Sequence, residues 1–271
     1  MLDDTKANLL LKSAKALAWD RAQKAVGNPP FSFSSSHKIA DTLILKGNSV
    51  DEAANMDYVR KHTTIPVPQP RYSHLSTWLA MDLVEGKSLL ECWEKQSLLM
   101  KFRIACTMRG YISQLRLLTG TIPGTVAHGR VRGILFDDSE QGPFESSTRF
   151  RQWCEMVAQS GWTSTLRYRR TIQAPENFPA PPTVGGEWPL VLTHADLNLS
   201  NIILSDDGVL WVIDWATSGF FPPWLESVAM SVYSDEPRSW RRFRWFIAGT
   251  SARYEAFWDL FITDVHRFHT R

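Results

Sequence analysis

The residues with the clearest chemical potential lie between positions 192 and 215. Asp196 and Asn201 stand on a predicted loop just before a strand, and Asp214 ends the strand that returns antiparallel to it. A hairpin of this register brings the loop and the far strand end together, so three oxygen-bearing side chains converge at one edge. Carboxylate and carboxamide oxygens suit Mg²⁺ rather than Zn²⁺, and one more carboxylate beside them can hold an attacking hydroxyl. This is the minimum set for metal-assisted phosphoryl transfer.

Short strands and turns must position this loop. Residues 202–204 and 210–213 are apolar and enclose the turn Ser205-Asp-Asp-Gly208, which together predict a β-hairpin. Upstream, residues 37–47 predict a second, shorter hairpin that carries Lys46. Residues 49–61 predict a helix, because Ser49 and Glu52 have capping-box spacing. Residues 65–68 must be extended, since each proline restricts the residue before it, and residues 78–84 predict a strand.

The rest of the chain has mostly helical patterns. An amphipathic helix is predicted over residues 5–26 and another over residues 150–160, whereas residues 120–148 and 175–186 have the composition of loops. Two apolar stripes at helical spacing predict a long central helix and a C-terminal helix; they comprise Leu98, Phe102, Ala105, Met108, Ile112 and Leu115, then Tyr254, Phe257, Phe261, Val265 and Phe268. We therefore expect an N-terminal helix (1–30), a small α+β unit (31–86) and a larger helical unit (87–271).

Two sequence blocks carry a resemblance to a known family. His194-Ala-Asp196-Leu-Asn-Leu-Ser-Asn201 is followed about a dozen residues later by Ile213-Asp214-Trp215. These blocks resemble the aminoglycoside phosphotransferase and choline kinase family of the protein-kinase-like superfold. The segments Glu52–Pro68 and Gly219–Glu226 look like its fungal branch. The resemblance implies an α+β fold with two lobes, in which a small, trimmed N-lobe binds the nucleotide and a larger, mainly helical C-lobe carries the catalytic residues.

The resemblance also implies a role for each matching residue. Asp196 would be the catalytic aspartate, which orients the acceptor hydroxyl or takes its proton, and His194 would brace the catalytic loop. Asn201 and Asp214 would hold Mg²⁺ ions that bridge the nucleotide phosphates. Lys46 would contact the phosphates, held in place by Glu52. The backbone of a hinge from Met81 through Leu83 to Val84 would meet the nucleobase of ATP or GTP.

Several of these residues also have ordinary structural interpretations. Asp196, Asn201 and Asp214 are residue types that favour turns. Lys46 could be an edge-strand lysine that discourages further strand pairing. Glu52 with Ser49 could simply cap the helix, which would fully explain a glutamate there.

Other candidates are weaker. Glu226 and Asp235 could recognise a cationic substrate, but a solvated helix face is the simpler interpretation for both. Trp215 and Trp224 flank the presumed site and could line an acceptor pocket. A basic cluster on a predicted helix is diluted by acidic neighbours, so we expect a solvated face rather than a nucleic-acid site; it comprises Arg238, Arg241, Arg242 and Arg244.

The sequence departs from the family in one region. The place of a glycine-rich phosphate loop holds Phe31-Ser-Phe-Ser-Ser-Ser-His37, so the nucleotide lobe looks trimmed. We expect a Mg²⁺-dependent small-molecule kinase that transfers the γ-phosphoryl group of ATP or GTP to a hydroxyl of a metabolite or natural product. The alternative is a kinase-like protein that no longer transfers phosphate and serves as a binding protein or a different biosynthetic enzyme. A protein kinase is disfavoured, because the chain runs from Asp214 directly to Gly219-Phe-Phe-Pro-Pro with no long activation segment.

Composition agrees with an enzyme of this kind. The chain has 271 residues and a formal net charge of +2, which argues against a dedicated nucleic-acid partner. Its three cysteines match no metal-site spacing, and no apolar run approaches the ~20 residues that span a bilayer. The start, Met1-Leu-Asp-Asp, lacks the features of a signal peptide. We expect a cytoplasmic protein with a small-molecule substrate and no membrane association, as a monomer or weak homodimer.

Overall fold

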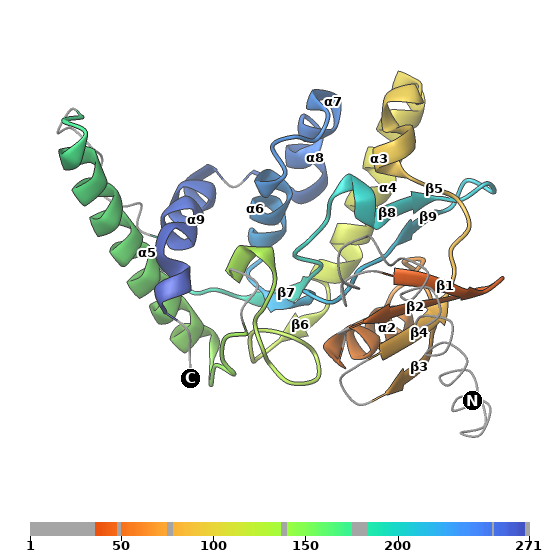
Figure 1. Ribbon diagram of the computed structural model, residues 1–271, viewed down its shortest axis with the longest axis horizontal. Coiled ribbons are helices and arrows are strands. Elements are labelled where there is room, and N and C mark those ends of the chain that lie inside the picture. Colours follow the sequence, from red (N-terminus) through yellow and green to blue (C-terminus); the bar gives the residue numbers. More distant parts are fainter. Residues whose placement is uncertain are drawn as a thin grey trace, which may run out of the picture.

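The computed structural model describes residues 36–47, 50–74, 78–136, 140–174, 184–250 and 252–268. The helix expected over residues 5–26 and the capping residue Ser49 lie outside these ranges. Within them the structure confirms an α+β fold with two lobes (Figure 1). A small sheet with one helix forms one lobe, and most of the helices form the other.

The N-lobe is an antiparallel sheet with the strand order β1-β2-β4-β3. Its elements are β1 (Ser36–Ala40), β2 (Leu43–Gly47), α2 (Val50–His62), β3 (Pro70–His74) and β4 (Trp78–Asp82). Lys46 lies on β2, where it pairs with Ser36 of β1 and Leu79 of β4. Because β2 has a neighbour on both sides, the interpretation of Lys46 as an edge-strand lysine is wrong.

The C-lobe is built from helices around two three-stranded sheets, β5-β8-β9 and β10-β7-β6. Its strands are β5 (Lys87–Ser88), β6 (Thr119–Gly120), β7 (Leu190–Thr193), β8 (Ile202–Leu204), β9 (Leu210–Val212) and β10 (Gly219–Phe221). Its α-helices are α3 (Leu89–Cys92), α4 (Leu98–Arg116), α5 (Ser147–Thr171), α6 (Leu225–Val232), α7 (Arg238–Arg241), α8 (Arg244–Ala248) and α9 (Ala252–Asp264). Short 3-10 helices are η1 (Trp93–Lys95), η2 (Ile134–Phe136), η3 (Leu199–Asn201) and η4 (Val265–Arg267).

Two apolar clusters hold these elements together. The first joins the lobes, because it contains Met56 of α2, Leu79 of β4, Ile104 of α4 and Val212 of β9. The second is rich in aromatic side chains and lies under α5, α6 and α9. The predicted C-terminal stripe contributes to it, with Phe257 and Phe261 fully enclosed. Within the described part of the chain, no helix is both long and apolar enough to cross a lipid bilayer.

Helix α5 is much longer than its sequence predicts. We expected residues 150–160, whereas the helix runs from Ser147 to Thr171. Its N-terminus is capped by Ser146, whose hydroxyl accepts the Arg149 N–H. The segment after Ser160 has weak helix formers, Gly161-Trp-Thr-Ser-Thr, so local propensity alone would end the helix there. Packing against α9 overrides this preference (Figure 1).

The α5–α9 contact predicts the effect of one added methyl group. A Cβ on Gly161 would lie 1.8 Å from the Leu260 carbonyl oxygen of α9. Gly161→Ala should therefore push the helices apart and lower the free energy of unfolding by about 3 kcal/mol, measured by chemical denaturation. Gly110→Ala is the matched control, because Gly110 is an exposed residue of α4 with nothing within 4 Å of the added atom. It should raise stability by up to about 1 kcal/mol, and equal effects for both variants would contradict the packing argument.

Candidate active site

The β8–β9 hairpin forms as predicted and sets one end of the site. Ile202 pairs with Val212, and the Ile213 N–H donates to the Asn201 carbonyl at 3.0 Å. Asn201 and Asp214 therefore flank the same end of the ribbon. Asp214 has a φ of 63°, a left-handed conformation that is rare for a residue other than glycine. Strained backbone of this kind is frequent at functional sites.

The N-lobe contributes Lys46 to this end of the hairpin. Its Nζ lies 2.5 Å from Asp214 Oδ1 and 3.1 Å from Glu52 Oε1. Burial works to lower the pKa of Lys46, but the carboxylates of Glu52 and Asp214 outweigh it and raise that pKa, so the ammonium stays charged. Glu52 is fully buried on α2, and burial raises its pKa while Lys46 opposes the rise. The structure thus supports the ion-pair interpretation of Glu52; its capping partner Ser49 is not among the described residues.

Asp196 is held by amide donors from both following asparagines. Asn201 Nδ2 donates at 2.9 Å to Asp196 Oδ2, and Asn198 Nδ2 donates at 3.2 Å to Asp196 Oδ1. Tyr233 also donates its hydroxyl to Asp196 Oδ1. Burial raises the pKa of Asp196 to about 6, and the nearby charge of Asp214 adds to the rise, while these hydrogen bonds oppose it. A carboxylate whose pKa lies close to neutrality suits proton transfer.

His194 is completely buried and serves the backbone of the loop. Its Nε2 donates to the Ile213 carbonyl at 3.0 Å, and its Nδ1 accepts the Asp196 N–H at 3.3 Å. Burial lowers the pKa of the imidazole, so it stays neutral in this arrangement. Both ring nitrogens are occupied, which fits the predicted bracing role and leaves none to exchange a proton with a substrate. The next residue, Ala195, has a φ of 65° and turns the chain towards Asp196.

The segment from Glu226 to Glu236 supports the catalytic loop at three points. Glu226 Oε2 accepts the His194 N–H at 2.7 Å, Tyr233 donates to Asp196, and Glu236 Oε1 accepts the Leu199 N–H at 2.7 Å. Glu226 is only 2% exposed, so the expectation of a solvated or cation-binding Glu226 is wrong. No local sequence signal indicates these contacts, because each joins residues more than thirty positions apart.

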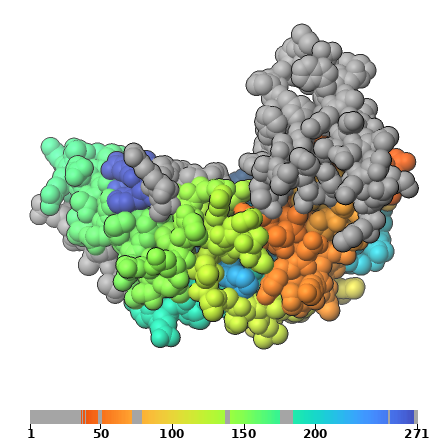
Figure 2. Space-filling view, turned by 90° about the horizontal axis from the view of Figure 1, so that it is seen from below, coloured from red at the N-terminus to blue at the C-terminus, as the bar shows by residue number. Residues whose placement is uncertain are grey.

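Asn55 is a second support that sequence reasoning missed. It lies on α2, is fully buried, and donates from Nδ2 to the carbonyls of Trp215 and Ser218, each at 2.8 Å. Its Oδ1 accepts the Val126 N–H at 3.2 Å. The Asn55 side-chain amide therefore links α2, the helix that carries Glu52, to the segment that follows Asp214 by hydrogen bonds. Figure 2 views this junction, where the orange α2 lies against the yellow-green segment that follows α4.

The other weak candidates occupy structural or solvent-exposed positions. Trp215 is fully buried and packs its ring against His194, so it does not line an acceptor pocket. Trp224 stacks on Tyr254 at 4.3 Å within the second apolar cluster. Asp235 is exposed, as expected. The basic cluster spans two short helices, α7 and α8, rather than one; three of its arginines are exposed, and Arg244 pairs with Glu255.

A pocket of about 160 Å³ joins these groups to the predicted hinge. Lys46 and Asp214 form one part of its lining, and Met81, Leu83 and Val84 form another. The Leu83 N–H already donates to the Thr42 carbonyl at 2.8 Å. That the hinge backbone meets a nucleobase stays a prediction, and the Leu83 N–H is not free to take part in it.

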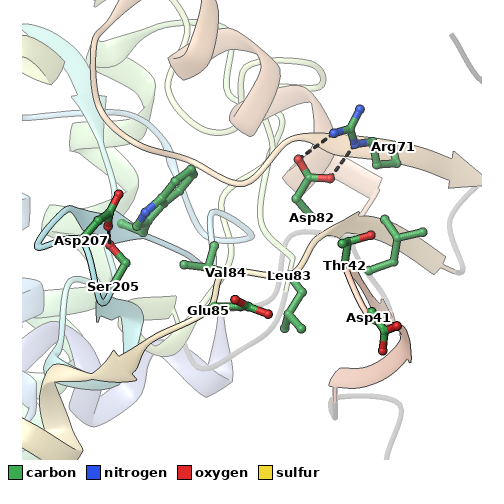
Figure 3. A pocket seen from close by; sticks show the side chains of 11 residues that line it. Asp41, Thr42, Arg71, Asp82, Leu83, Val84, Glu85, Ser205 and Asp207 are labelled. Atoms are coloured by element: carbon green, nitrogen blue, oxygen red, sulfur yellow. Dashed lines mark hydrogen bonds and ion pairs between the residues drawn. The ribbon is translucent and has the colours of Figure 1, made fainter.

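A larger pocket of about 740 Å³ lies on another side of the hinge, and Leu83 and Val84 line it too (Figure 3). Arg71 makes a bidentate ion pair with Asp82 there, with distances of 2.5 and 3.0 Å. The lining includes neither Lys46 nor Asp214, so size alone does not identify the reactive pocket.

The donor set fits Mg²⁺ held jointly with phosphates. Among the described residues, no group of three or more His, Cys, Asp or Glu side chains forms a protein-only metal cage. Mg²⁺ in phosphoryl-transfer sites is instead held by one or two carboxylates together with substrate oxygens. Asp214 offers a partly exposed carboxylate, and Asn201 lies beside it at the end of the hairpin. These two residues would hold the ion, as the sequence predicts.

The fold and this arrangement define a protein-kinase-like phosphotransferase. A sequence model of the phosphotransferase enzyme family matches residues 44–260, well over half of the chain, so the chain belongs to that family. Among solved structures, the gentamicin complex of APH(2″)-IIa is 15% identical with a TM-score of 0.52, over 84% of this chain and 77% of that one. Aminoglycoside-3′-phosphotransferase of type VIII is 15% identical with a TM-score of 0.50, over 91% of this chain and 98% of that one. At such identities the likeness shows the fold alone. No curated protein matches the chain in sequence.

The raised pKa of the Glu236 carboxyl predicts that the stability of the protein depends on pH. Burial raises its pKa to about 7 from an ordinary value of 4.5. A carboxyl whose pKa is raised in the folded state favours folding most below its unfolded pKa, and this contribution is lost progressively as pH rises from the unfolded pKa to the folded pKa. The free energy of unfolding should therefore fall by about 2–3 kcal/mol between pH 4.5 and 7 through this group. Glu236→Gln should remove that slope in denaturant titrations, whereas exposed Glu85→Gln should not; the same slope in both variants would contradict the assignment.

Proposed function

We propose that the chain is a Mg²⁺-dependent small-molecule kinase that transfers the γ-phosphoryl group of ATP or GTP to a hydroxyl group. The observation that carries the proposal is the meeting of Lys46, Asp214, Asn201 and Asp196 from two lobes at one end of the β8–β9 hairpin. Family membership supports the reaction class. Phosphoryl transfer depends mainly on positioning and charge neutralisation, which these groups are placed to supply.

Each residue takes a defined part in this scheme. Lys46 binds phosphate oxygens, and Glu52 fixes its ammonium group. Asn201 and Asp214 bind Mg²⁺, which when present neutralises charge on the phosphates. Asp196 accepts a hydrogen bond from the acceptor hydroxyl and then its proton. Met81, Leu83 and Val84 border the base, with the Leu83 N–H excluded as a donor.

The test is a transfer screen with the full chain, Mg²⁺ and either ATP or GTP. Acceptors should span aminoglycosides such as gentamicin, macrolides, amino alcohols, nucleosides and polyols, because APH(2″)-IIa was solved with gentamicin. A product heavier by one phosphoryl group, formed together with the nucleoside diphosphate, is the expected result. Transfer that persists unchanged after removal of Mg²⁺ with EDTA would contradict the proposal.

One observation favours the alternative of a kinase-like binding protein. The pocket at Lys46 holds about 160 Å³, whereas ligand pockets usually measure about 300–1,000 Å³. Calorimetry decides between the two. Binding of Mg·ATP or Mg·GTP supports the kinase, and no heat at millimolar nucleotide supports the alternative.

A further inference from the structure

We propose that Tyr233 occupies the acceptor-hydroxyl position on Asp196 and thereby limits wasteful transfer of phosphate to water while no acceptor is bound. This inference rests on the proposed function and deepens it. Tyr233 follows directly after α6, and its hydroxyl donates to Asp196 Oδ1. An acceptor alcohol would make the same bond, since its O–H must also donate to this carboxylate before transfer.

The hydrogen bonds of Asp196 leave little room for a second hydroxyl. A carboxylate oxygen accepts about two hydrogen bonds. Oδ1 already accepts from Tyr233 and Asn198, and Oδ2 accepts from Asn201, the residue expected beside the metal. An incoming hydroxyl on the Oδ1 side must therefore displace one of its two donors.

Tyr233 is the donor that can leave. Asn198 is 6% exposed and is fixed from its other amide atom, because its Oδ1 accepts the Ser200 N–H at 2.9 Å. Tyr233 is half-buried and is followed by exposed Ser234 and Asp235. From residue 190 to residue 199, only Asp196 is not buried, so Tyr233 covers the point where this stretch reaches the surface.

Orientation of Asp196 does not require Tyr233. Asn201 Nδ2 contacts both the main-chain oxygen and Oδ2 of Asp196 at 2.9 Å, and Asn198 Nδ2 contacts the main-chain oxygen and Oδ1 at 3.2 Å. Burial and the Asp196 carboxylate raise the pKa of Tyr233 above its ordinary value of 10, so the phenol remains a donor at working pH. A protonated phenol held there excludes water from the oxygen that would otherwise activate it.

Without the phenol, the competing reaction is hydrolysis of the nucleotide. The water oxygen forms a bond to the γ-phosphorus, the bond from that phosphorus to the β–γ bridging oxygen breaks, and the water proton passes to Asp196. The products are the nucleoside diphosphate and inorganic phosphate. Tyr233→Phe removes only the hydroxyl, so water can take its place on Oδ1.

The experiment measures phosphate release from Mg·ATP and Mg·GTP with no acceptor present. Tyr233→Phe should raise this rate about tenfold, and Tyr233→Leu at least as much, because water is then positioned beside the base. Adding Asp196→Asn to Tyr233→Phe should abolish the gain. Tyr111→Phe is the matched control, since that hydroxyl donates to the Leu210 carbonyl at 3.1 Å outside the site, and it should leave hydrolysis unchanged.

The outcomes separate this inference from the proposed function. If Tyr233→Phe binds Mg·nucleotide as the unaltered chain does but hydrolyses it no faster, Tyr233 merely supports the loop and the inference is overturned, while the kinase proposal stands. If the unaltered chain binds no Mg·nucleotide, both are overturned. A gain that survives Asp196→Asn would also overturn the inference, because the water would not be acting through Asp196.

Discussion

Asp196→Asn is expected to lower the rate of phosphoryl transfer by about 10²–10⁴-fold, because the amide cannot take the acceptor proton. Asparagine keeps the shape of the side chain, and its one side-chain oxygen can still accept the hydrogen bond from the Tyr233 hydroxyl. Lys46 and Asp214 are untouched, so the affinity for Mg·nucleotide should change by no more than a few-fold. The measurement is the initial transfer rate with the best acceptor from the screen, together with calorimetric titration of Mg·nucleotide.

Asp206→Asn is the matched control for this substitution. Asp206 lies exposed in the turn between β8 and β9, on the same hairpin but away from the reactive end. It should transfer phosphate at the rate of the unaltered chain. If Asp196→Asn retained more than about one-tenth of the transfer rate, Asp196 would not be the general base, since loss of a positioned base lowers the rate by more than about tenfold.

Lys46→Met is expected to lower the free energy of unfolding by about 3–5 kcal/mol at neutral pH, because it leaves Glu52 buried without its cation. The side chain of Glu52 is wholly inaccessible to solvent. Burial already raises the pKa of Glu52 from its ordinary value of 4.5, and loss of the Lys46 charge raises it further. The deficit should therefore be small below pH 4.5 and grow as pH rises, since ionisation of the buried carboxyl then opposes folding.

A double substitution separates the stability of this pair from its function. Lys46→Met combined with Glu52→Met replaces a buried ion pair by apolar side chains, a change that is often neutral. The double variant should recover most of the stability and flatten the pH dependence in denaturant titrations, yet bind Mg·nucleotide as poorly as Lys46→Met alone. If Lys46→Met were as stable as the unaltered chain at pH 7, Glu52 would be explained by helix capping instead.

Local sequence signals were sufficient for the reactive hairpin. The Ser-Asp-Asp-Gly turn and its apolar flanks predicted β8 and β9, and their register placed Asn201 beside Asp214. The hairpin with Lys46 and the helix with Glu52 also follow from short-range patterns. These elements depend on turn chemistry and periodicity over a few residues, which a single sequence displays directly.

Contacts between distant residues could not be predicted in the same way. Glu226 has the pattern of a solvated helix residue, and only the packing of α6 against the catalytic loop buries it under His194. Tyr233 and Glu236 reach that loop across 37 positions of sequence. Helix α5 continues past Ser160 because α9 covers Gly161, which no local propensity reveals. Tertiary packing decides each of these features.

The most direct test of the account is calorimetric titration with a non-hydrolysable nucleotide, with Mg²⁺ present and then removed by EDTA. The unaltered chain should bind the analogue more tightly with Mg²⁺, and Asp214→Asn should lose that Mg²⁺-dependent gain. Equal affinity with and without Mg²⁺ in the unaltered chain, or no binding at millimolar nucleotide, would contradict the assignment of Asp214 and Asn201 as the residues that hold the metal beside the phosphates.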